Sequence, residues 1–270
     1  MYKDVVGKDF SILKQKKLYL FDMDGTIYLD NKLFDGVDEF LKKIKAEDGK
    51  YVFITNNSSR SVVDYVKKLH KLGLKYIVED DFLTSAQVSK MLLKQKYGDN
   101  LLYAQGTRSF IKELTDGGLN ITQRFDENAV AVIVGFDTEL TSEKLNTTCK
   151  MLTKRDIPYY ATNPDWVCPV DFGYIPDCGS MCFGIEKATG KIPIYIGKPQ
   201  PQMILSAMEK FNFSKEQTVV FGDRLYTDIA SGVNAGVDTV LVLSGEATLK
   251  DYEKSEVKPT FVLNHLKEML

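Results

Sequence analysis

The stretch LYLFDMDGTIY, residues 18–28, constrains the fold of this chain more than any other feature of the sequence. Its first four residues are apolar and favour a β-strand, and the run stops abruptly at Asp22-Met23-Asp24-Gly25. We therefore predict a buried strand whose carboxyl end presents Asp22 and Asp24 at the edge where open α/β sheets bind ligands. Two carboxylates so close together repel each other unless a cation or a shared proton compensates, so the stretch predicts a metal site.

Apolar runs that predict strands alternate with segments of helical period along the whole chain, which indicates an α/β fold with a parallel sheet covered by helices. The first and last parts of the chain are expected to form one domain, with strands over 18–21, 51–54, 193–196, 218–221 and 239–243 and helices over 36–46, 61–72, 201–211 and 227–235. The middle part repeats the pattern, with strands over 101–104, 130–134 and 158–161 and helices over 85–97, 107–115 and 142–154. We predict that this middle part is a second α/β domain inserted into the first.

Polar residues follow two more of the expected strands. The strand over 51–54 leads into TNNSSR, where Thr55, Asn56 and the backbone N–H groups at a helix start can bind an anion. The strand over 193–196 leads into Gly197-Lys198-Pro199, which brings a single ammonium group to a strand end. Taken alone, helix capping would explain Asn56, and a solvated side chain would explain Lys198.

The strand over 218–221 leads into GDRLYTDI, which brings Asp223 and Asp228 to the turn before a helix. Asp228 has a simpler explanation as a residue that caps the helix start. The combination of four strand ends that carry carboxylates, a hydroxyl and an ammonium group is a much more specific sign of a functional site than any one of them. They predict a shared polar site.

Composition and charge exclude several classes of function. A net charge of −2 and a pI near 5.8 argue against a broad nucleic-acid or anionic-membrane surface, and the cluster Lys67, Lys68, His70 and Lys71 is expected to be a solvated helix face. The longest apolar run, residues 129–134, is far short of the roughly 20 residues that a membrane span needs. The four cysteines form no CxxC pair, and no signal-peptide pattern is present, so we expect a cytoplasmic protein with reduced thiols.

The motifs Asp-x-Asp-Gly-Thr, Thr-Asn-Asn, Gly-Lys-Pro and Gly-Asp-x4-Asp, in this order, resemble the four motifs of the haloacid dehalogenase-like superfamily. The long gap between the second and third motifs, and the segment ATNPDWVCP, resemble its NagD/4-nitrophenylphosphatase branch. The resemblance covers nearly the whole chain. It implies a magnesium-dependent phosphate-monoester hydrolase with a Rossmann-like parallel-sheet core, residues 1–79 and 191–270, and an inserted α/β cap domain, residues 80–190.

Phosphoryl transfer consists mainly of positioning and charge neutralisation, which gives each residue an expected role. Asp22 would attack phosphorus and form an aspartyl-phosphate. The resemblance implies that Asp24 protonates the leaving alkoxide and later activates water. Thr55, the backbone around Asn56, and Lys198 would hold the phosphoryl oxygens.

An all-oxygen site suits Mg²⁺, which is the expected cofactor. Asp22, Asp223 and the main-chain carbonyl of Asp24 are the expected direct ligands, and Asp228 would help directly or through water. The small phosphate ester that the enzyme cleaves is expected to be a sugar phosphate, a nucleoside monophosphate or a similar compound, with 4-nitrophenyl phosphate turned over in vitro.

Substrate specificity is expected in a loop over residues 163–177 of the cap. Asn163, Asp165 and Trp166 are the candidate contacts, with Asp171 as a further one. The alternative is that this loop only packs the cap.

Two other functions stay open. A phosphotransferase or mutase would use the same aspartyl-phosphate, although residues 27–50 are too short for the helical cap of the mutases that we compare. A non-catalytic protein that binds phosphorylated ligands would be expected to have lost one of the four acids, and all four are present. We expect neither nucleic acid nor membrane as a partner, and the oligomeric state stays open, a homodimer included.

Overall fold

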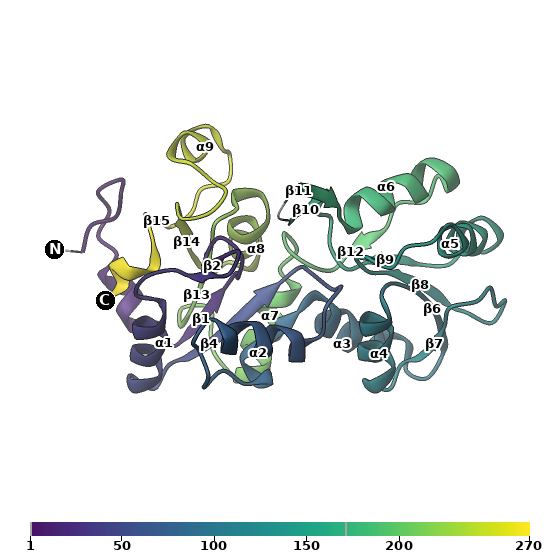
Figure 1. Ribbon diagram of the computed structural model, residues 1–270, viewed down its shortest axis with the longest axis horizontal. Helices are drawn as coiled ribbons and strands as arrows, with labels where there is room; N and C mark the ends of the chain where they lie inside the picture. The colour runs from purple at the N-terminus through teal and green to yellow at the C-terminus, as the bar shows by residue number, and fades with distance from the viewer. Residues whose placement is uncertain (1, 171) are drawn as a thin grey trace. The chain divides into compact units, whose positions relative to one another are not determined.

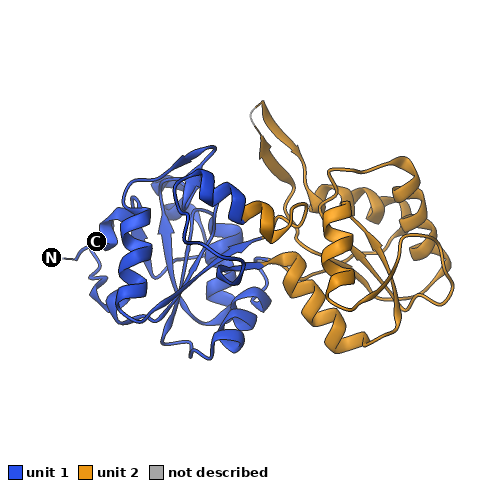
Figure 2. Cartoon of the chain, turned by 60° about the horizontal axis from the view of Figure 1, so that its bottom comes forward, with its two compact units in different colours: residues 1–55, 66–83, 198–270 blue, residues 56–65, 84–197 orange. Residues whose placement is uncertain are grey.

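The computed structural model describes residues 2–170 and 172–270, which divide into two compact units (Figure 2). The first unit comprises the chain up to Thr55, residues 66–83 and the chain from Lys198 onward, and the second comprises residues 56–65 and 84–197. The core and cap predicted from the sequence have boundaries at residues 80 and 190. They differ from this division by a few residues and in the placement of residues 56–65, and they stay a prediction.

A six-stranded sheet forms the centre of the first unit, in the order β15-β14-β13-β1-β4-β5 (Figure 1). The strands are β1 (Leu18–Phe21), β4 (Lys50–Thr55), β5 (Phe82–Thr84), β13 (Thr218–Gly222), β14 (Asp238–Val242) and β15 (Phe261–Leu263). Strand β1 pairs in parallel with both β13 and β4, and β14 pairs in parallel with β13 and β15. The predicted parallel α/β fold is therefore confirmed.

Aromatic side chains fix the register of the central strands. Phe21 of β1 lies opposite Phe221 of β13 and Phe53 of β4. The ring centroids of Phe21 and Phe221 are 5.0 Å apart, and Phe40 packs edge-on against both rings. Because the strands are parallel and in register, the residues that follow them lie at one edge of the sheet.

The remaining elements of the first unit surround this sheet or follow its strands. They are the helices α1 (Val37–Ala46), α7 (Gln202–Phe211), α8 (Ala230–Ala235) and α9 (Leu249–Lys254), the short 3₁₀ or π segments η1 (Ser11–Gln15), η2 (Glu79–Asp81), η3 (Leu225–Ile229) and η4 (Leu266–Met269), and the antiparallel pair β2 (Tyr28–Leu29) and β3 (Lys32–Leu33). Helix α2 (Val62–Lys71) contains the boundary between residues 65 and 66. In α1 the buried residues Val37, Phe40 and Ile44 recur every three or four positions, as one apolar helix face requires.

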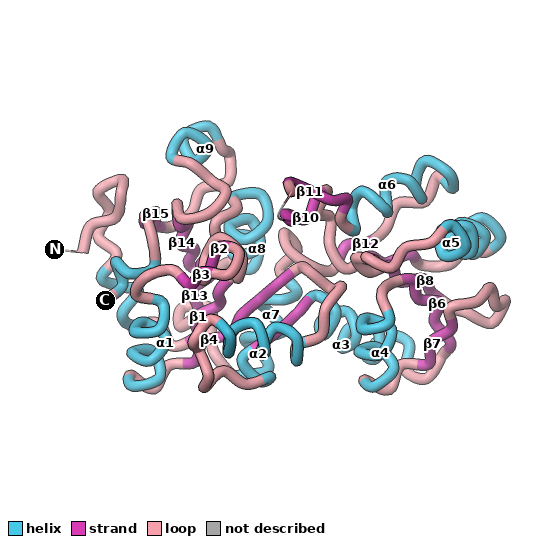
Figure 3. Tube along the Cα trace, in the orientation of Figure 1, coloured by secondary structure: helices cyan, strands magenta, loops and turns pink. Residues whose placement is uncertain are grey.

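The second unit has its own parallel sheet, in the order β12-β9-β8-β6-β7, and helices are interspersed among its strands along the chain (Figure 3). The elements are α3 (Ser85–Tyr97), β6 (Leu101–Gln105), α4 (Arg108–Asp116), β7 (Asn120–Thr122), β8 (Ala131–Val134), α5 (Ser142–Lys154), β9 (Tyr159–Ala161), β10 (Val167–Val170), β11 (Gly173–Pro176), α6 (Cys178–Thr189) and β12 (Ile194–Tyr195). The expected helices over 85–97 and 142–154 are confirmed to the residue.

Two sequence-based expectations about individual elements are wrong. The strand expected over 193–196 in the first domain is the two-residue strand β12, which pairs with β9 in the sheet of the second unit. The loop expected over 163–177 contains an antiparallel hairpin, β10 paired with β11. Both elements are too short to show a period that identifies their pairing partner. Asp171, named as a further contact in this segment, lies outside the described residues.

Helices in the described parts of the chain are short. Helices α3 and α5 have 13 residues each, whereas a bilayer span needs about 20 apolar residues. Accordingly, none of the helices in residues 2–170 and 172–270 combines the length and the apolar character that crossing a membrane requires.

Candidate functional site

Three carboxylates gather at the carboxyl ends of β1 and β13 in the first unit. Asp22 directly follows β1, and its backbone N–H continues the sheet by donating to the Phe221 carbonyl at 2.9 Å. Asp223 directly follows β13, and Asp228 lies in the π-helical turn η3. Asp22, Asp223 and Asp228 each contribute one oxygen to a group of atoms within 4.8 Å of one another. The structure thus brings together three of the acids that the sequence places after two different strands.

The Lys198 ammonium group lies between two of these acids. Its Nζ is 2.5 Å from Asp22 Oδ1 and 2.6 Å from Asp228 Oδ1, and only 2% of the residue is exposed. Burial alone would lower the Lys198 pKa, but the two carboxylates raise it above its ordinary value. Lys198 therefore stays protonated and offsets part of the negative charge.

The remaining negative charge is not balanced by Lys198 alone. Burial, and next the charge of Asp228, raise the pKa of Asp22 well above its ordinary value, although Lys198 opposes this shift. Burial and the same Asp228 charge raise the pKa of Asp223 to about 7. Asp223 and Asp228 are buried and Asp22 is partly buried. The Lys198 ammonium group binds two of these carboxylates, and the nearby Arg224 guanidinium, which is paired with Glu246, also lowers the Asp223 pKa. Three carboxylates so close together still form an environment that favours a further cation.

The oxygen atoms of Asp223 fit a divalent cation. Its Oδ2 accepts a hydrogen bond from the Glu246 N–H at 2.7 Å, whereas its buried Oδ1 has no hydrogen-bond partner among residues 2–170 and 172–270. A Cβ on Gly245 would lie 2.0 Å from Asp223 Oδ2, and one on Gly25 would lie 2.2 Å from it. Glycine at these two positions lets the backbone close around the carboxylate and fix it, and hard oxygen donors of this kind suit Mg²⁺.

Asp24 lies in a different environment from Asp22, although one residue separates them. Its side chain is 53% exposed. The Tyr28 hydroxyl donates to Asp24 Oδ2 at 3.2 Å, and Lys68 Nζ lies 3.4 Å from Asp24 Oδ1. The expectation that Lys68 belongs to a solvated helix face is therefore wrong. Its side chain is only 24% exposed, and it contacts Asp24, which lies just after the end of β1.

Sequence reasoning missed Lys68 and Tyr28 as neighbours of Asp24. Lys68 is 44 residues from Asp24, and nothing in its helical pattern distinguishes it from the adjacent lysine. The only available signal for Tyr28 was its spacing of four residues from Asp24, across a turn at Gly25, where φ is +83°. A spacing of this kind does not identify a partner without the turn geometry.

The two predicted phosphate-binding residues after β4 fall on either side of the unit boundary. Thr55 ends β4 and is buried, and the carbonyl of the preceding Ile54 is 3.4 Å from Lys198 Nζ. Asn56 begins a segment of the second unit, where its side-chain amide donates to Asp165 Oδ2 at 2.8 Å.

Asn163 and Asp165 belong to a buried hydrogen-bond network of the second unit. The Asn163 amide donates to Asp165 Oδ2 at 2.8 Å and to Asp177 Oδ1 at 3.0 Å, and both Asn163 and Asp165 are buried. Trp166 is instead 58% exposed, and its ring packs edge-on against Phe183 with centroids 5.5 Å apart. This placement fits the alternative that Asn163 and Asp165 hold the segment in place, and it leaves Trp166 available as a contact.

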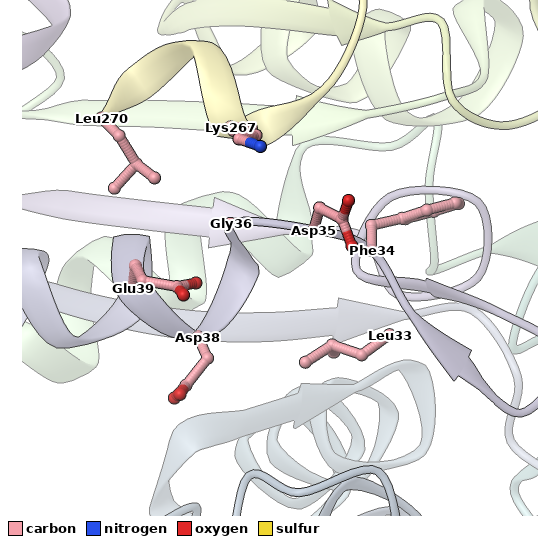
Figure 4. A pocket seen from close by; sticks show the side chains of 8 residues that line it. All are labelled: Leu33, Phe34, Asp35, Gly36, Asp38, Glu39, Lys267 and Leu270. Carbon is pink, nitrogen blue, oxygen red and sulfur yellow. The ribbon is translucent and has the colours of Figure 1, made fainter.

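A hollow elsewhere on the first unit does not coincide with the acids (Figure 4). It is lined by residues 33–36, 38 and 39 together with Lys267 and Leu270. None of these is a predicted site residue, and Asp38 is already hydrogen-bonded to Lys42 and Tyr76. We place the functional site at the carboxylates, because clustered charged side chains with shifted pKa values are typical of functional sites, and the residues that line the hollow form no such cluster.

Two family models match the chain. Residues 19–120 match the haloacid dehalogenase-like hydrolase model, and residues 195–269 match the HAD-hydrolase-like model. Together the two matches cover more than half of the 270 residues.

Solved and curated proteins resemble the chain over nearly its whole length. A 4-nitrophenylphosphatase structure from Thermotoga maritima has 40% sequence identity and a TM-score of 0.90, covering 96% of this chain and 97% of that one. An acid sugar phosphatase of Staphylococcus aureus is 31% identical, covering 96% of this chain and 98% of that protein. A glycerol phosphate phosphatase from Mycobacterium tuberculosis, solved in complex with magnesium, has 28% identity and a TM-score of 0.89, covering 96% of this chain and 78% of that one.

The metal-free protein should lose stability as the pH rises from about 4 to about 7. Asp223 has a pKa raised to about 7 in the folded chain, against about 3.9 in an unfolded chain. Between these two pKa values only the folded form holds the proton. The contribution of Asp223 to the free energy of unfolding, on the order of 2–4 kcal/mol, is therefore present at low pH and is lost as the pH rises through the folded pKa. Thermal unfolding in EDTA across this range measures the effect.

The Asp223→Asn variant provides the control for this pH dependence, because the other titrating groups remain. Its stability should fall less over the same interval than that of the unsubstituted protein. Added Mg²⁺ should stabilise the unsubstituted protein more at pH 8 than at pH 5, since the metal competes with the proton. If stability falls equally steeply with pH in both proteins, the pH dependence does not come from Asp223.

Proposed function

The chain belongs to the haloacid dehalogenase-like hydrolase family, and we propose that it hydrolyses small phosphate monoesters through an aspartyl-phosphate formed on Asp22, with Mg²⁺ as cofactor. The observation that supports this most directly is the cluster in which Lys198 joins Asp22 and Asp228 beside Asp223. It combines a carboxylate at a strand end, a fixed ammonium group and a set of oxygen ligands. These are the parts that phosphoryl transfer requires.

Asp22 is the proposed nucleophile. Lys198 binds its Oδ1 at 2.5 Å, so the carboxylate is held in one orientation and the other oxygen is the one that attacks phosphorus. The attack forms an acyl phosphate and displaces the alcohol, which divides hydrolysis into two easier steps. Lys198 and Thr55 stabilise the charge on the phosphoryl oxygens during both steps.

Asp24 is the proposed acid and base. It gives a proton to the departing oxygen in the first step and accepts one from water in the second. Its side chain is 53% exposed, against 15% for Asp22, which fits a group that must exchange a proton with both ester and water. Asn56 stays a predicted phosphate-binding residue through its backbone N–H, because its side-chain amide is hydrogen-bonded to Asp165.

Asp22, Asp223 and the Asp24 main-chain carbonyl are the proposed Mg²⁺ ligands, with Asp228 directly or through water. Asp223 Oδ1, which accepts no hydrogen bond from the part of the chain that the structure describes, and the all-oxygen donor set support this choice. When bound, the metal neutralises phosphate charge and so lets one anion approach another.

The proposed substrate class is a small phosphate monoester, such as a sugar phosphate. The S. aureus relative is named an acid sugar phosphatase and the M. tuberculosis structure a glycerol phosphate phosphatase, which supports a small phosphorylated alcohol. The T. maritima structure is named for 4-nitrophenyl phosphate, which supports that ester as a laboratory substrate.

Hydrolysis of 4-nitrophenyl phosphate should depend on a divalent metal. We expect turnover with Mg²⁺ to fall by at least about 100-fold in EDTA, because the buried carboxylates would then repel the phosphate. Release of nitrophenolate measures the rate, and excess Mg²⁺ added after EDTA should restore it. Undiminished turnover in EDTA would overturn the metal requirement.

Replacing Asp22 by asparagine should lower kcat by at least about 1,000-fold with the fold intact, because an amide cannot attack phosphorus as a carboxylate does. Asp30→Asn is the matched control, since Asp30 is exposed and its left-handed backbone, with φ at 52°, tolerates asparagine. Near-normal turnover by Asp22→Asn would disprove the covalent mechanism. Transfer of the phosphoryl group to a second sugar phosphate, in place of release as free phosphate, would favour the phosphotransferase.

Trp166 and Asp165 should respond differently to replacement by alanine. Asp165→Ala should destabilise the protein by about 1–3 kcal/mol, because the amides of Asn56 and Asn163 each lose a hydrogen bond to this carboxylate. Trp166→Ala should leave the melting temperature nearly unchanged and lower kcat/KM more for the best natural ester than for 4-nitrophenyl phosphate. Equal losses for both esters would show that Trp166 does not select substrate.

A further inference from the structure

Asp24, Tyr28 and Lys68 form a group in which each side chain contacts the other two. The Tyr28 hydroxyl donates to Asp24 Oδ2 at 3.2 Å, and Lys68 Nζ lies 3.4 Å from Asp24 Oδ1. The same ammonium group lies 3.8 Å from the centroid of the Tyr28 ring. Each carboxylate oxygen of Asp24 therefore has its own donor, and the two donors are held against each other.

The three residues come from different parts of the first unit and differ in burial. Tyr28 is fully buried, and its carbonyl accepts from the Gly25 N–H at 2.8 Å, which closes the turn after β1. Lys68 lies within helix α2, in the portion that belongs to the first unit. Asp24 itself is 53% exposed. An aspartate this exposed would sample several rotamers unless its neighbours restrained it.

The geometry points to Lys68 and Tyr28 as positioning residues that hold the Asp24 carboxyl group in the orientation needed for proton transfer. This inference rests on the function proposed above, in which Asp24 is the acid and base. It differs from that function in assigning a role to two residues outside the four motifs. A proton donor has to lie within hydrogen-bond reach of the departing oxygen, so a misplaced carboxyl group loses rate even when it is chemically intact.

Proton transfer accompanies bond cleavage in both steps. In the first step a bond forms between an Asp22 oxygen and phosphorus, the bond from phosphorus to the leaving oxygen breaks, and the Asp24 proton moves to that oxygen. In the second step a water oxygen bonds to phosphorus and gives its proton to Asp24, and the bond to Asp22 breaks to release phosphate. The first step needs the proton most when the leaving oxygen is strongly basic.

The dependence on the leaving group separates positioning from a merely structural role. Nitrophenolate is a weakly basic leaving group and departs with little help, whereas phenolate and an alkoxide need a proton. Loss of a positioning residue should therefore slow phenyl phosphate and an alkyl phosphate much more than 4-nitrophenyl phosphate. A change in folding or in metal binding would slow all three esters alike.

The test compares Lys68→Met and Tyr28→Phe with the unsubstituted protein. Methionine keeps the length of the lysine and removes its charge, and phenylalanine keeps the ring and removes the hydroxyl. Lys67→Met is the matched control, because Lys67 is the exposed neighbour on the same helix. The measurement is kcat/KM for the three esters in saturating Mg²⁺, since this constant reports the steps up to release of the alcohol.

We expect kcat/KM of Lys68→Met to fall about 10- to 100-fold for phenyl and alkyl phosphates and less than about threefold for 4-nitrophenyl phosphate. Tyr28→Phe should show the same pattern, Lys68→Arg should recover part of the loss, and Lys67→Met should behave like the unsubstituted protein. Should Lys68→Met fail to fold, Tyr28→Phe and Lys68→Arg supply the comparison.

Equal losses for all three esters, or the same pattern in Lys67→Met, would overturn the positioning role while leaving the proposed hydrolysis intact. Turnover of 4-nitrophenyl phosphate alone, with neither phenyl nor alkyl phosphate cleaved, would also overturn the positioning role, because Asp24 would then protonate no basic leaving group. Absence of hydrolysis of any ester by the unsubstituted protein with Mg²⁺ would instead refute the proposed function, and the positioning role with it.

Discussion

The ion pairs of Lys198 are the interaction on which the site depends. Its ammonium group is within 2.6 Å of carboxylate oxygens from both Asp22 and Asp228 in a buried position. Without this charge, adjacent strands could not present buried acids at the same edge of the sheet, since desolvation and repulsion would force protonation or open the strand ends. Lys198 is also the residue at which the chain returns to the first unit, 176 residues after Asp22.

The two aspartates of one motif differ because their surroundings differ. Asp22 directly continues a fully buried strand and is paired with a buried lysine. Asp24 lies beyond the strand end, half exposed, with Lys68 and Tyr28 as donors. Environment can assign different chemical roles to identical side chains in this way, and here it separates Asp22, the proposed nucleophile, from Asp24, the proposed acid and base.

The second unit uses polar side chains differently. Its network of Asn56, Asn163, Asp165 and Asp177 consists of side-chain amides that each donate to a carboxylate, and both Asn163 and Asp165 are buried. Such a network fixes the conformation of the segment that carries it. The segment around Trp166 therefore has a rigid base and an exposed aromatic side chain, a combination suited to contact with a ligand.

The sequence by itself determined the α/β alternation, the helices α3 and α5 of the second unit and the strand ends at which the acids lie, because period and turn residues are local signals. It also determined the family, since the four motifs are read in order along the chain. Only the tertiary structure decided that β12 joins the second sheet, that residues 163–177 contain a hairpin, and that Lys68 reaches Asp24. These features depend on which distant segments pair or pack, and a two-residue strand or one lysine among several on a helix carries no local signal that specifies its partner.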